Sequence, residues 1–189
     1  MTSKKLSIPG LLIVLVSLLA ASSSPQVARA ADPATDSPTA RAAGTITLAS
    51  QGTSWVPEVR SGFSRWRPVG WGTQAKVKAA GVGDQWVHIE VPGAPFVNGY
   101  LTGVYSVQFC AQSTNGAQTK PIRVDLWNST TQFHSEPVTW WADNAAHCWV
   151  MDISPAKWTV TIGISVLLHF ANTTDQITLQ WAAAAFTYG

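Results

Sequence analysis

Strict alternation of apolar and polar side chains is the feature that most constrains the fold of this chain. Successive side chains of a β-strand point to opposite faces, so a period of two predicts a strand with one buried face, whereas a helix needs a period of 3.6. The segments 85–91 and 121–127 alternate in this way. The predicted inward residues are Val87, Ile89 and Val91 in the first and Ile122, Val124 and Leu126 in the second; the predicted outward residues are Trp86, His88, Glu90, Arg123, Asp125 and Trp127.

Longer stretches carry the same period. Residues 158–170 are predicted to form one strand, and two more long strands are expected at 100–111 and 176–188. The run Ala182–Ala185 favours a helix by propensity, but it lies in strand context, so we expect a closely packed final strand. The predicted inward face of the first stretch comprises Trp158, Val160, Ile162, Ile164, Val166, Leu168 and Phe170.

Turn-forming residues separate these segments. Gly, Pro, Asn and Asp break the chain into a series of short strands, and no part of the mature domain sustains a helical period. Short strands without helices are typical of antiparallel architectures. We therefore predict an all-β fold, a single antiparallel β-sandwich or jelly roll.

The first 30 residues have the three parts of a secretory signal peptide. Lys4 and Lys5 precede an apolar run over 11–21, and residues 28–30 form an A-x-A cleavage site. The apolar run is too short to span a bilayer and no later window replaces it. We therefore expect a secreted, extracellular protein that begins near Ala31, without stable membrane insertion.

Composition divides the mature chain into a tail and one domain. Residues 31–44 contain no large apolar side chain and are predicted to be a flexible tail, while 45–189 are long enough for one core. Lys4, Lys5 and Arg29 leave with the signal, so the formal net charge changes from +2 to −1. A nearly neutral protein lacks the broad positive field of non-specific nucleic-acid binding, so no nucleic-acid partner is expected.

Cys110 and Cys148 are the only cysteines. In an oxidising compartment a lone pair most often forms one disulfide. Each cysteine shares its predicted strand face with polar neighbours, Ser106 and Gln108 in one case and Asp152 in the other. We therefore predict a cross-strand disulfide on the outer face of a sheet; two separately buried thiols are the alternative.

Histidine and glutamate form two H-x-E pairs, His88 with Glu90 and His134 with Glu136. Each pair places two possible ligands on one strand face, but a metal site needs three or four that converge. Polar residues on half-buried strands give the same pattern, so no metal and no cofactor are predicted. No nucleophile elbow or papain-like cysteine motif occurs and the carboxylates are scattered, so no enzymatic activity is expected, although a triad can arise in any chain order.

Residues 60–78 combine basic and aromatic side chains and contain no acid. Such a segment can bind anionic glycans or single-stranded nucleic acid by charge and stacking. The competing interpretation, which we favour, places the tryptophans in the core and the arginines on a solvated rim. The side chains concerned are Arg60, Arg65, Arg67, Lys76, Lys78, Phe63, Trp66 and Trp71.

Ten tryptophans is a high count for a domain of this size. Trp86 and Trp127 fall on predicted polar faces, and the adjacent Trp140 and Trp141 must point to opposite faces if extended, so one of that pair should leave the core. Aromatic platforms stack on sugar rings and also anchor protein interfaces. The candidate binding residues are Trp66, Trp71, Trp86, Trp127, Trp140, Trp141, Arg65 and Arg67.

Four short motifs carry a resemblance: QGTS at 51–54, GWGT at 70–73, WVHI at 86–89 and IGIS at 162–165. Over about 51–186 the chain resembles an uncharacterised, largely actinobacterial family of small β-sandwich proteins, which implies the fold but no activity. The signal, the tail and the cysteine pair depart from that family and suggest an extracellular adaptation. In layout alone, the chain is similar to the small secreted adaptor subunits of actinobacterial umbrella toxin particles.

The sequence thus predicts a secreted, non-catalytic binding protein. The first hypothesis is a protein–protein adaptor in an extracellular assembly, with a secreted protein partner docked through residues 31–44. The alternative is a carbohydrate or cell-wall binding module that uses exposed tryptophans, and the third is an unrecognised hydrolase. A post-cleavage spacer without function is the competing interpretation of the tail.

Overall fold

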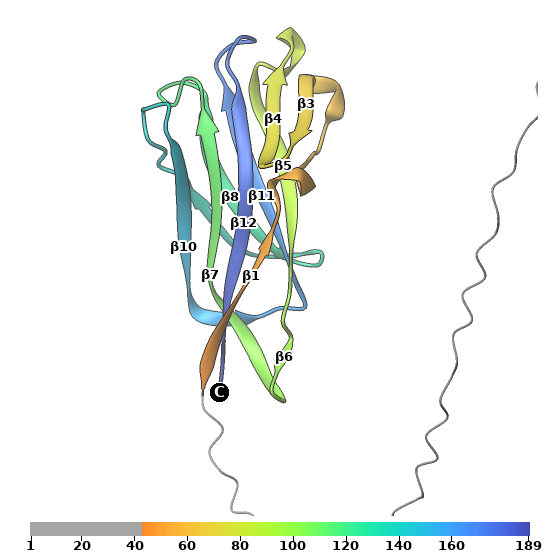
Figure 1. The fold of residues 1–189 in the computed structure, drawn as a ribbon, viewed down its shortest axis with the longest axis vertical. Coiled ribbons are helices and arrows are strands. Elements are labelled where there is room, and N and C mark those ends of the chain that lie inside the picture. Colours follow the sequence, from red (N-terminus) through yellow and green to blue (C-terminus); the bar gives the residue numbers. More distant parts are fainter. Residues whose placement is uncertain (1–42) are drawn as a thin grey trace, which may run out of the picture. The chain divides into compact units, whose positions relative to one another are not determined.

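The computed structural model describes residues 43–189, so the predicted signal peptide at 1–30 and residues 31–42 of the predicted tail lie outside the described residues. The described part forms two antiparallel sheets that pack face to face (Figure 1). The predicted antiparallel β-sandwich is confirmed. Within this part of the chain, no helix is long and apolar enough to cross a membrane. Its helical segments are three single 3₁₀ turns, η1 (Gly52–Ser54), η2 (Arg60–Gly62) and η3 (Ala79–Gly81).

The larger sheet has seven strands and the smaller sheet has five. In the larger sheet the order is β10 (Ala146–Trp158), β7 (Tyr100–Ser113), β12 (Ile177–Tyr188), β4 (Gly72–Val77) and β3 (Phe63–Val69), with β1 (Gly44–Ser50) beside β12 and β6 (Phe96–Val97) beside β7. In the smaller sheet it is β2 (Val56–Pro57), β5 (Gly83–Pro92), β11 (Thr161–Phe170), β8 (Lys120–Asn128) and β9 (Thr131–Pro137).

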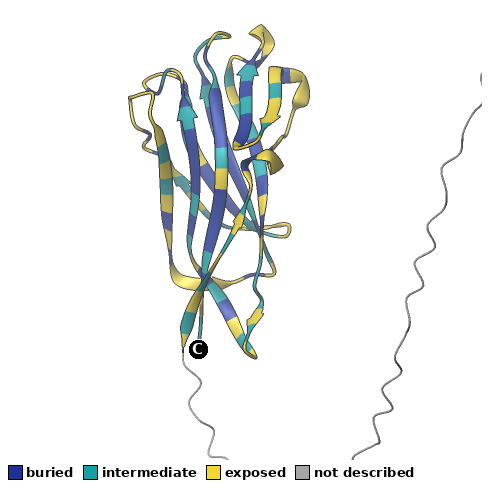
Figure 2. Ribbon diagram, viewed as in Figure 1, coloured by how far each residue is buried: buried dark blue, intermediate teal, exposed yellow. Residues whose placement is uncertain are grey.

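Apolar residues on the facing sides of the two sheets form the core, and the buried strands are dark blue in Figure 2. The inward positions predicted for 85–91 are buried, as are those predicted for 162–170. The larger sheet contributes large side chains from its central strands β7 and β12. The largest fully buried side chains include Phe109, Phe170, Phe186, Leu126, Ile162, Ile164, Leu168, Ile177 and Leu179.

The single strand predicted for 158–170 is wrong at its beginning. β10 ends at Trp158 and β11 begins at Thr161, because the chain crosses from the larger to the smaller sheet between them. Trp158 and Val160 therefore lie in solvent, with exposures of 49% and 50%. The period of two continues through the crossing, so the alternation of residue types contains no sign of the break.

Ile122 is half-buried rather than inward-facing as predicted. The register of β8 against β11 shifts at this point, since Leu167 lies opposite Arg123 while Leu168 lies opposite Pro121. The extra residue of this irregularity moves Pro121 into the buried position. Alternation in the sequence does not reveal such a shift.

The first and last described strands pair with each other. β1 runs antiparallel to β12 from Gly44, opposite Tyr188, to Ser50, opposite Ala182. The start of β1 and the C-terminus consequently lie at the same pole of the sandwich (Figure 1). β1 begins one residue before the predicted domain start. The close packing predicted for Ala182–Ala185 is confirmed for its first three residues, which are buried.

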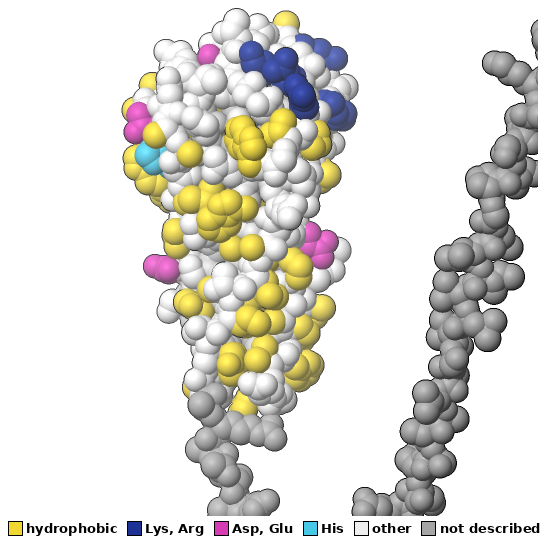
Figure 3. Space-filling model, in the orientation of Figure 1, with side chains coloured by type: hydrophobic (Ala, Val, Ile, Leu, Met, Phe, Trp, Pro, Cys, Tyr) yellow, Lys and Arg dark blue, Asp and Glu magenta, His cyan; other side chains and the backbone are white. Residues whose placement is uncertain are grey.

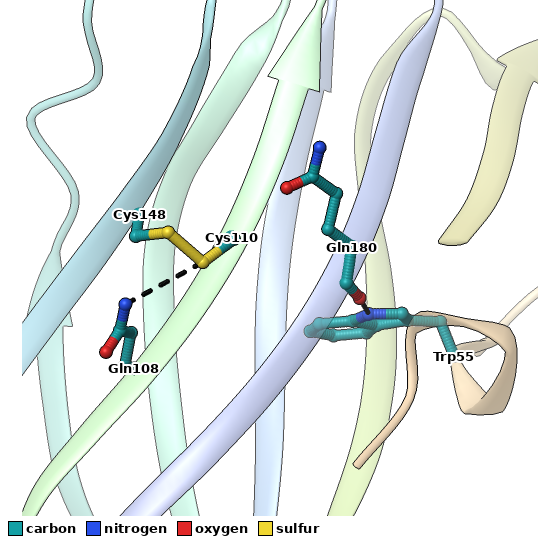
Figure 4. Close-up of a disulfide and its surroundings, with 5 residues drawn as sticks. All are labelled: Trp55, Gln108, Cys110, Cys148 and Gln180. Atoms are coloured by element: carbon teal, nitrogen blue, oxygen red, sulfur yellow. Dashed lines mark hydrogen bonds between the residues drawn. A yellow bond between two sulfur atoms is a disulfide. The ribbon is translucent and has the colours of Figure 1, made fainter. Parts of the chain in front are cut away.

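β12 changes its partner near its middle. Residues 182–188 pair with β1, whereas 177–179 pair with β4, and the register against β7 also shifts between these two stretches. Trp55, which follows η1, is fully buried and donates its indole N–H to the carbonyl oxygen of Gln180 at 2.7 Å (Figure 4). This bond satisfies a carbonyl at the point where the ladder is interrupted.

The QGTS and GWGT motifs meet at this change of partner. Thr73 donates its hydroxyl to the carbonyl oxygen of Gly52 at 2.7 Å and is itself buried. A Cβ added to Gly52 would collide with the carbonyl oxygen of Gln180, and one added to Gly72 would collide with that of Leu179. The two motifs are therefore explained by close backbone packing.

Gly72→Ala should destabilise the domain by about 1–3 kcal/mol, because the new methyl group must displace backbone rather than a flexible side chain. Gly70→Ala is the matched control, since a Cβ there meets nothing within 4 Å. The free energies of unfolding in urea measure both effects. Equal stabilities of the two variants would contradict the packing argument.

The predicted disulfide is confirmed. Cys110 of β7 lies directly opposite Cys148 of β10 and is bonded to it (Figure 4). Its neighbours Phe109 and Ala111 are buried on the core side, so the bridge lies on the outer face of the larger sheet. Gln108, on the same face, places its amide nitrogen 3.7 Å from the Cys110 sulfur.

The double variant C110A/C148A should lose about 3–4 kcal/mol of unfolding free energy in the chain-entropy description, because the bridge joins residues with a sequence separation of 38. Urea denaturation measures the loss. A reducing agent should lower the midpoint of the wild type and leave that of the double variant unchanged. If the reducing agent left the urea midpoint of the wild type unchanged, the disulfide would add no stability.

Candidate functional site

The outer face of the smaller sheet carries polar side chains in register. β11 is its central strand, between β5 and β8. Pairing across these strands brings together residues that are distant in the sequence, and it aligns the WVHI motif of β5 with the IGIS motif of β11. Two adjacent rows cross the centre of the sheet: Glu90–Gly163–Trp127 and His88–Ser165–Asp125.

A hollow of about 620 Å³ opens over this part of the sheet. Gly163 lies in this hollow and has no side chain to fill it. A second hollow of about 540 Å³ shares Ser54, Glu90 and Thr161 with the first and extends to Val160, so we treat the two as one groove. The lining of the first hollow is Ser54, Val56, His88, Ile89, Glu90, Ser129, Thr130, Thr161 and Gly163.

His88 is the titratable side chain in the groove whose pKa is shifted. Its Nδ1 lies 2.8 Å from the hydroxyl oxygen of Ser165, which is buried. Burial lowers the pKa of His88 below its ordinary value of 6.5, and the charge of Glu58 opposes this shift. The imidazole is therefore neutral at pH 7, with one nitrogen able to donate and the other to accept a hydrogen bond.

Asp125 is only 5% exposed, although the alternation predicted it to face outward. It does lie on the outer face, but its carboxylate oxygen accepts hydrogen bonds from Arg123 at 2.9 Å and Ser135 at 2.7 Å. The Arg123 guanidinium also lies 5.8 Å from the ring centroid of Trp86. Among the described residues, Glu90 by contrast belongs to no ion pair.

Trp86 and Trp127 lie on this outer face as predicted, and both are half-buried. Trp127 packs beside the groove, because a Cβ added to Gly163 would lie 3.3 Å from its Cβ atom. Its indole N–H is buried and has no hydrogen-bond partner within the described part. Two strand spacings and four residues separate the backbone positions of Trp86 and Trp127, or roughly 16 Å along the diagonal.

Four other predicted binding residues lie on the β3–β4 hairpin of the larger sheet. Arg65 and Arg67 are exposed. Trp66 is half-buried against the core, with its ring centroid 5.0 Å from that of Phe63. Trp71, at the turn, is 57% exposed. The expected core position thus applies to Trp66 but not to Trp71.

Trp140 and Trp141 lie in the connection between β9 and β10. Trp140 is 7% exposed and stacks on Phe109, whereas Trp141 is 40% exposed and stacks on His147 with centroids 4.3 Å apart. The prediction that one of the pair leaves the core is confirmed. A hydrogen bond from His147, 2.6 Å long, lowers the pKa of Asp143 below its ordinary value of 3.8.

The two H-x-E pairs are not brought together. His88 and Glu90 lie on β5, while His134 and Glu136 lie on β9, with β11 and β8 between them. Glu136 is bound instead by His134 at 3.2 Å and by the indole N–H of Trp149 at 2.9 Å. Among residues 43–189, no group of three or more His, Cys, Asp or Glu is placed to hold a metal ion.

Several residues of the groove were not predicted from the sequence. They come from η1, from the β8–β9 turn and from β11, so only strand register and turn position bring them together. The juxtaposed WVHI and IGIS motifs were the available signal, since they supply His88, Gly163 and Ser165. The missed residues are Ser54, Ser129, Thr130, Thr161, Gly163 and Ser165.

The chain matches no protein-family model, and no curated protein matches it either. Its fold is similar to the CBM36-1 domain of a multidomain xylanase from the hindgut metagenome of Trinervitermes trinervoides, at 10% identity and a TM-score of 0.43 over 75% of this chain and 96% of that one. A carbohydrate-binding module CBM36 in complex with calcium and xylotriose is 13% identical in sequence, with a TM-score of 0.40. The match covers 71% of this chain and 96% of that one. A family two carbohydrate esterase from Cellvibrio japonicus is 11% identical in sequence, with a TM-score of 0.45. The match covers 78% of this chain and 36% of that one. What these neighbours bind is a property of those proteins.

The burial of neutral His88 predicts a pH dependence of stability. Because the folded-state pKa is lowered, the unfolded chain binds the proton more readily, so the free energy of unfolding should fall as pH decreases from 6.5 through the lowered pKa. His88→Gln should remove this part of the slope. Urea denaturation between about pH 5 and pH 8 measures it.

His169→Gln is the matched control, because His169 lies on β11 in the same sheet as His88. This variant should keep the part of the pH dependence of stability that His88 causes. Identical slopes for the wild type and His88→Gln would show that burial of His88 does not control the acid side of the stability profile.

Proposed function

We propose that the domain binds a neutral carbohydrate chain in the groove on the outer face of the smaller sheet. The observation that carries this proposal is the groove's lining, in which hydroxyl groups surround one imidazole and one carboxylate. Sugars present closely spaced hydroxyls that both donate and accept hydrogen bonds. Ser, Thr, neutral His and ionised Glu provide the complementary groups.

Glu90 is the strongest polar group that the groove offers. It is exposed and, among the described residues, belongs to no ion pair, so its carboxylate is free to accept hydrogen bonds. Hydrogen bonds to a charged group are stronger than those between neutral groups. The same negative charge opposes the entry of acidic sugars. A neutral chain is therefore the better ligand.

Trp127 supplies the apolar contact. It lies against Gly163 at the border of the groove, and an aromatic ring in such a position can pack against the apolar face of a sugar. Its indole N–H is buried and has no hydrogen-bond partner among the described residues, so it is a donor that a ligand oxygen would satisfy. The two joined hollows, of about 620 and 540 Å³, give the groove room for more than one sugar unit.

The proposed role is binding without reaction. Ser165 approaches His88, but it is buried in the middle of the central strand and paired on both sides, with His88 and with Asp125. A nucleophile must be accessible and must have free backbone donors nearby to stabilise an oxyanion. We therefore assign the hydrogen bond between Ser165 and His88 a structural role, which is to hold the imidazole in place in the groove.

The protein-adaptor hypothesis stays a prediction. Its docking arm, residues 31–44, lies outside the described residues except for Ala43 and Gly44, and Gly44 is already part of β1. Secretion likewise stays a prediction, because it depends on residues 1–30. Neither bears on whether the groove binds sugar.

Titration calorimetry with soluble neutral polysaccharides, namely xylan, galactan and mannan, tests the proposal. At least one should bind, and Glu90→Gln should weaken binding about tenfold or more, since a hydrogen bond to a charged acceptor is replaced by a weaker one. Asp152→Asn, which removes an exposed carboxylate from β10 of the larger sheet, should leave the affinity unchanged.

Two results would contradict this function. One is the absence of binding to all three polysaccharides. The other is an affinity that Glu90→Gln and Trp127→Ala leave unchanged, which would place any sugar site elsewhere on the molecule. Thermal unfolding of each variant verifies that the fold is retained.

A further inference from the structure

A second surface on the opposite sheet carries an uncompensated charge. Arg65 and Arg67 lie on β3, Lys76 lies on β4, and Lys78 follows β4. Figure 3 shows the Lys and Arg side chains gathered at this corner of the molecule, over β3 and β4, without an acidic side chain among them. None of these four cations belongs to an ion pair within the described part. We call these four residues the basic corner.

Strand register forces the charges together. Arg65 lies directly opposite Lys76, while the alternate residue Trp66 lies opposite buried Ala75, so the cations share the outer face. Directly opposed side chains on neighbouring strands have Cβ atoms about 5 Å apart, and like charges at that distance are destabilising. Arg67 follows Arg65 on the same face, roughly 7 Å further along the strand.

The charge is local and does not reflect the protein as a whole. The sequence has 12 Lys and Arg against 10 Asp and Glu, yet residues 60–78 contain no acid. Elsewhere Arg123 is paired with Asp125 at 2.9 Å. Apart from Arg123, the other described cations, Arg60, Lys120 and Lys157, also lie outside ion pairs, so the corner is distinguished by the clustering of its four cations. Such a cluster is complementary to a ligand with several negative groups.

The aromatic residues of the hairpin argue against single-stranded nucleic acid. That class of ligand needs several aromatic platforms on which successive bases stack. Trp66 packs against Phe63 and the core, so Trp71 is the exposed aromatic ring on this hairpin. One platform at the turn end of a hairpin that carries four cations fits an extended sugar chain with charged groups.

We infer that the basic corner binds an anionic glycan, a sugar chain that carries sulfate or carboxylate groups a few ångströms apart. Arg65 and Arg67 supply planar guanidinium groups for bidentate contacts, and Lys76 and Lys78 supply point charges. Trp71 lies at the β3–β4 turn, beyond the Val69–Gly72 row and at the opposite end of the hairpin from Lys78, where it can pack against a sugar ring of an extended chain. This site is on the larger sheet and is independent of the groove on the smaller sheet.

Fluorescence titration in about 50 mM salt tests the inference with three carbohydrate probes: dextran sulfate, polygalacturonate and unmodified dextran of matched length. Dextran sulfate supplies sulfate groups and polygalacturonate supplies carboxylates, so the two distinguish the sources of charge. At least one anionic probe should bind far more tightly than dextran, and binding should weaken steeply as salt is raised.

The double variant R65Q/K76Q should weaken binding of the anionic probe at least about tenfold, because two contacting charges are lost. The control K120Q/K157Q removes the same total charge from outside the hairpin and should change the affinity less than about twofold. Both positions of the test variant are solvent-accessible, so the fold should persist, and its thermal stability should be unchanged or raised by the loss of the opposed charges.

Three outcomes would overturn the inference. Equal weakening by the two double variants would mean that net charge alone drives binding. Binding of neither anionic probe would mean that the basic corner is only a solvated rim. Binding of oligothymidylate as tight as that of the anionic glycans would assign the corner to nucleic acid. Loss of sugar binding in Glu90→Gln without effect on dextran sulfate would separate this site from the groove.

Discussion

The fold depends on the way β12 shares its hydrogen bonds. This strand pairs with β7 along one edge and with both β4 and β1, in succession, along the other. The interruption between the two partners leaves backbone groups that need other bonds, and Trp55 satisfies the Gln180 carbonyl there. Glycines at 52 and 72 permit the approach. One buried indole therefore hydrogen-bonds to β12 at the point where β1 and β4 meet along its edge.

The strand predictions are correct where the apolar positions of the alternating pattern are the buried positions. Residues 85–91 have their apolar positions in the core, and the disulfide pairs as expected. The errors at Val160 and Ile122 have a common cause, since a chain crossing and a register shift both leave the alternation of residue types intact. The groove could not be predicted, because Ser165 meets His88 only through the pairing of β11 with β5, and single-strand patterns contain no information on register.

The outer faces of the two sheets carry different functional groups. The smaller sheet carries a hydroxyl-lined groove with one free carboxylate, while a corner of the larger sheet carries four unpaired cations. The buried core lies between them, so a ligand on one face does not contact a ligand on the other. With both proposed sites occupied, the domain would bridge a neutral and an anionic polymer.

The pairing of β1 with β12 also governs how the domain responds to force. Gly44 lies opposite Tyr188, so a load applied between the first described strand and the C-terminus acts across the hydrogen bonds of this ladder. Bonds perpendicular to antiparallel strands then break one after another from the loaded end, and not all at once as in shear. A protein held at its C-terminal pole while its N-terminal side is pulled would thus unzip at low tension. The disulfide between β7 and β10 lies outside that path and would keep those two strands joined after β1 has separated.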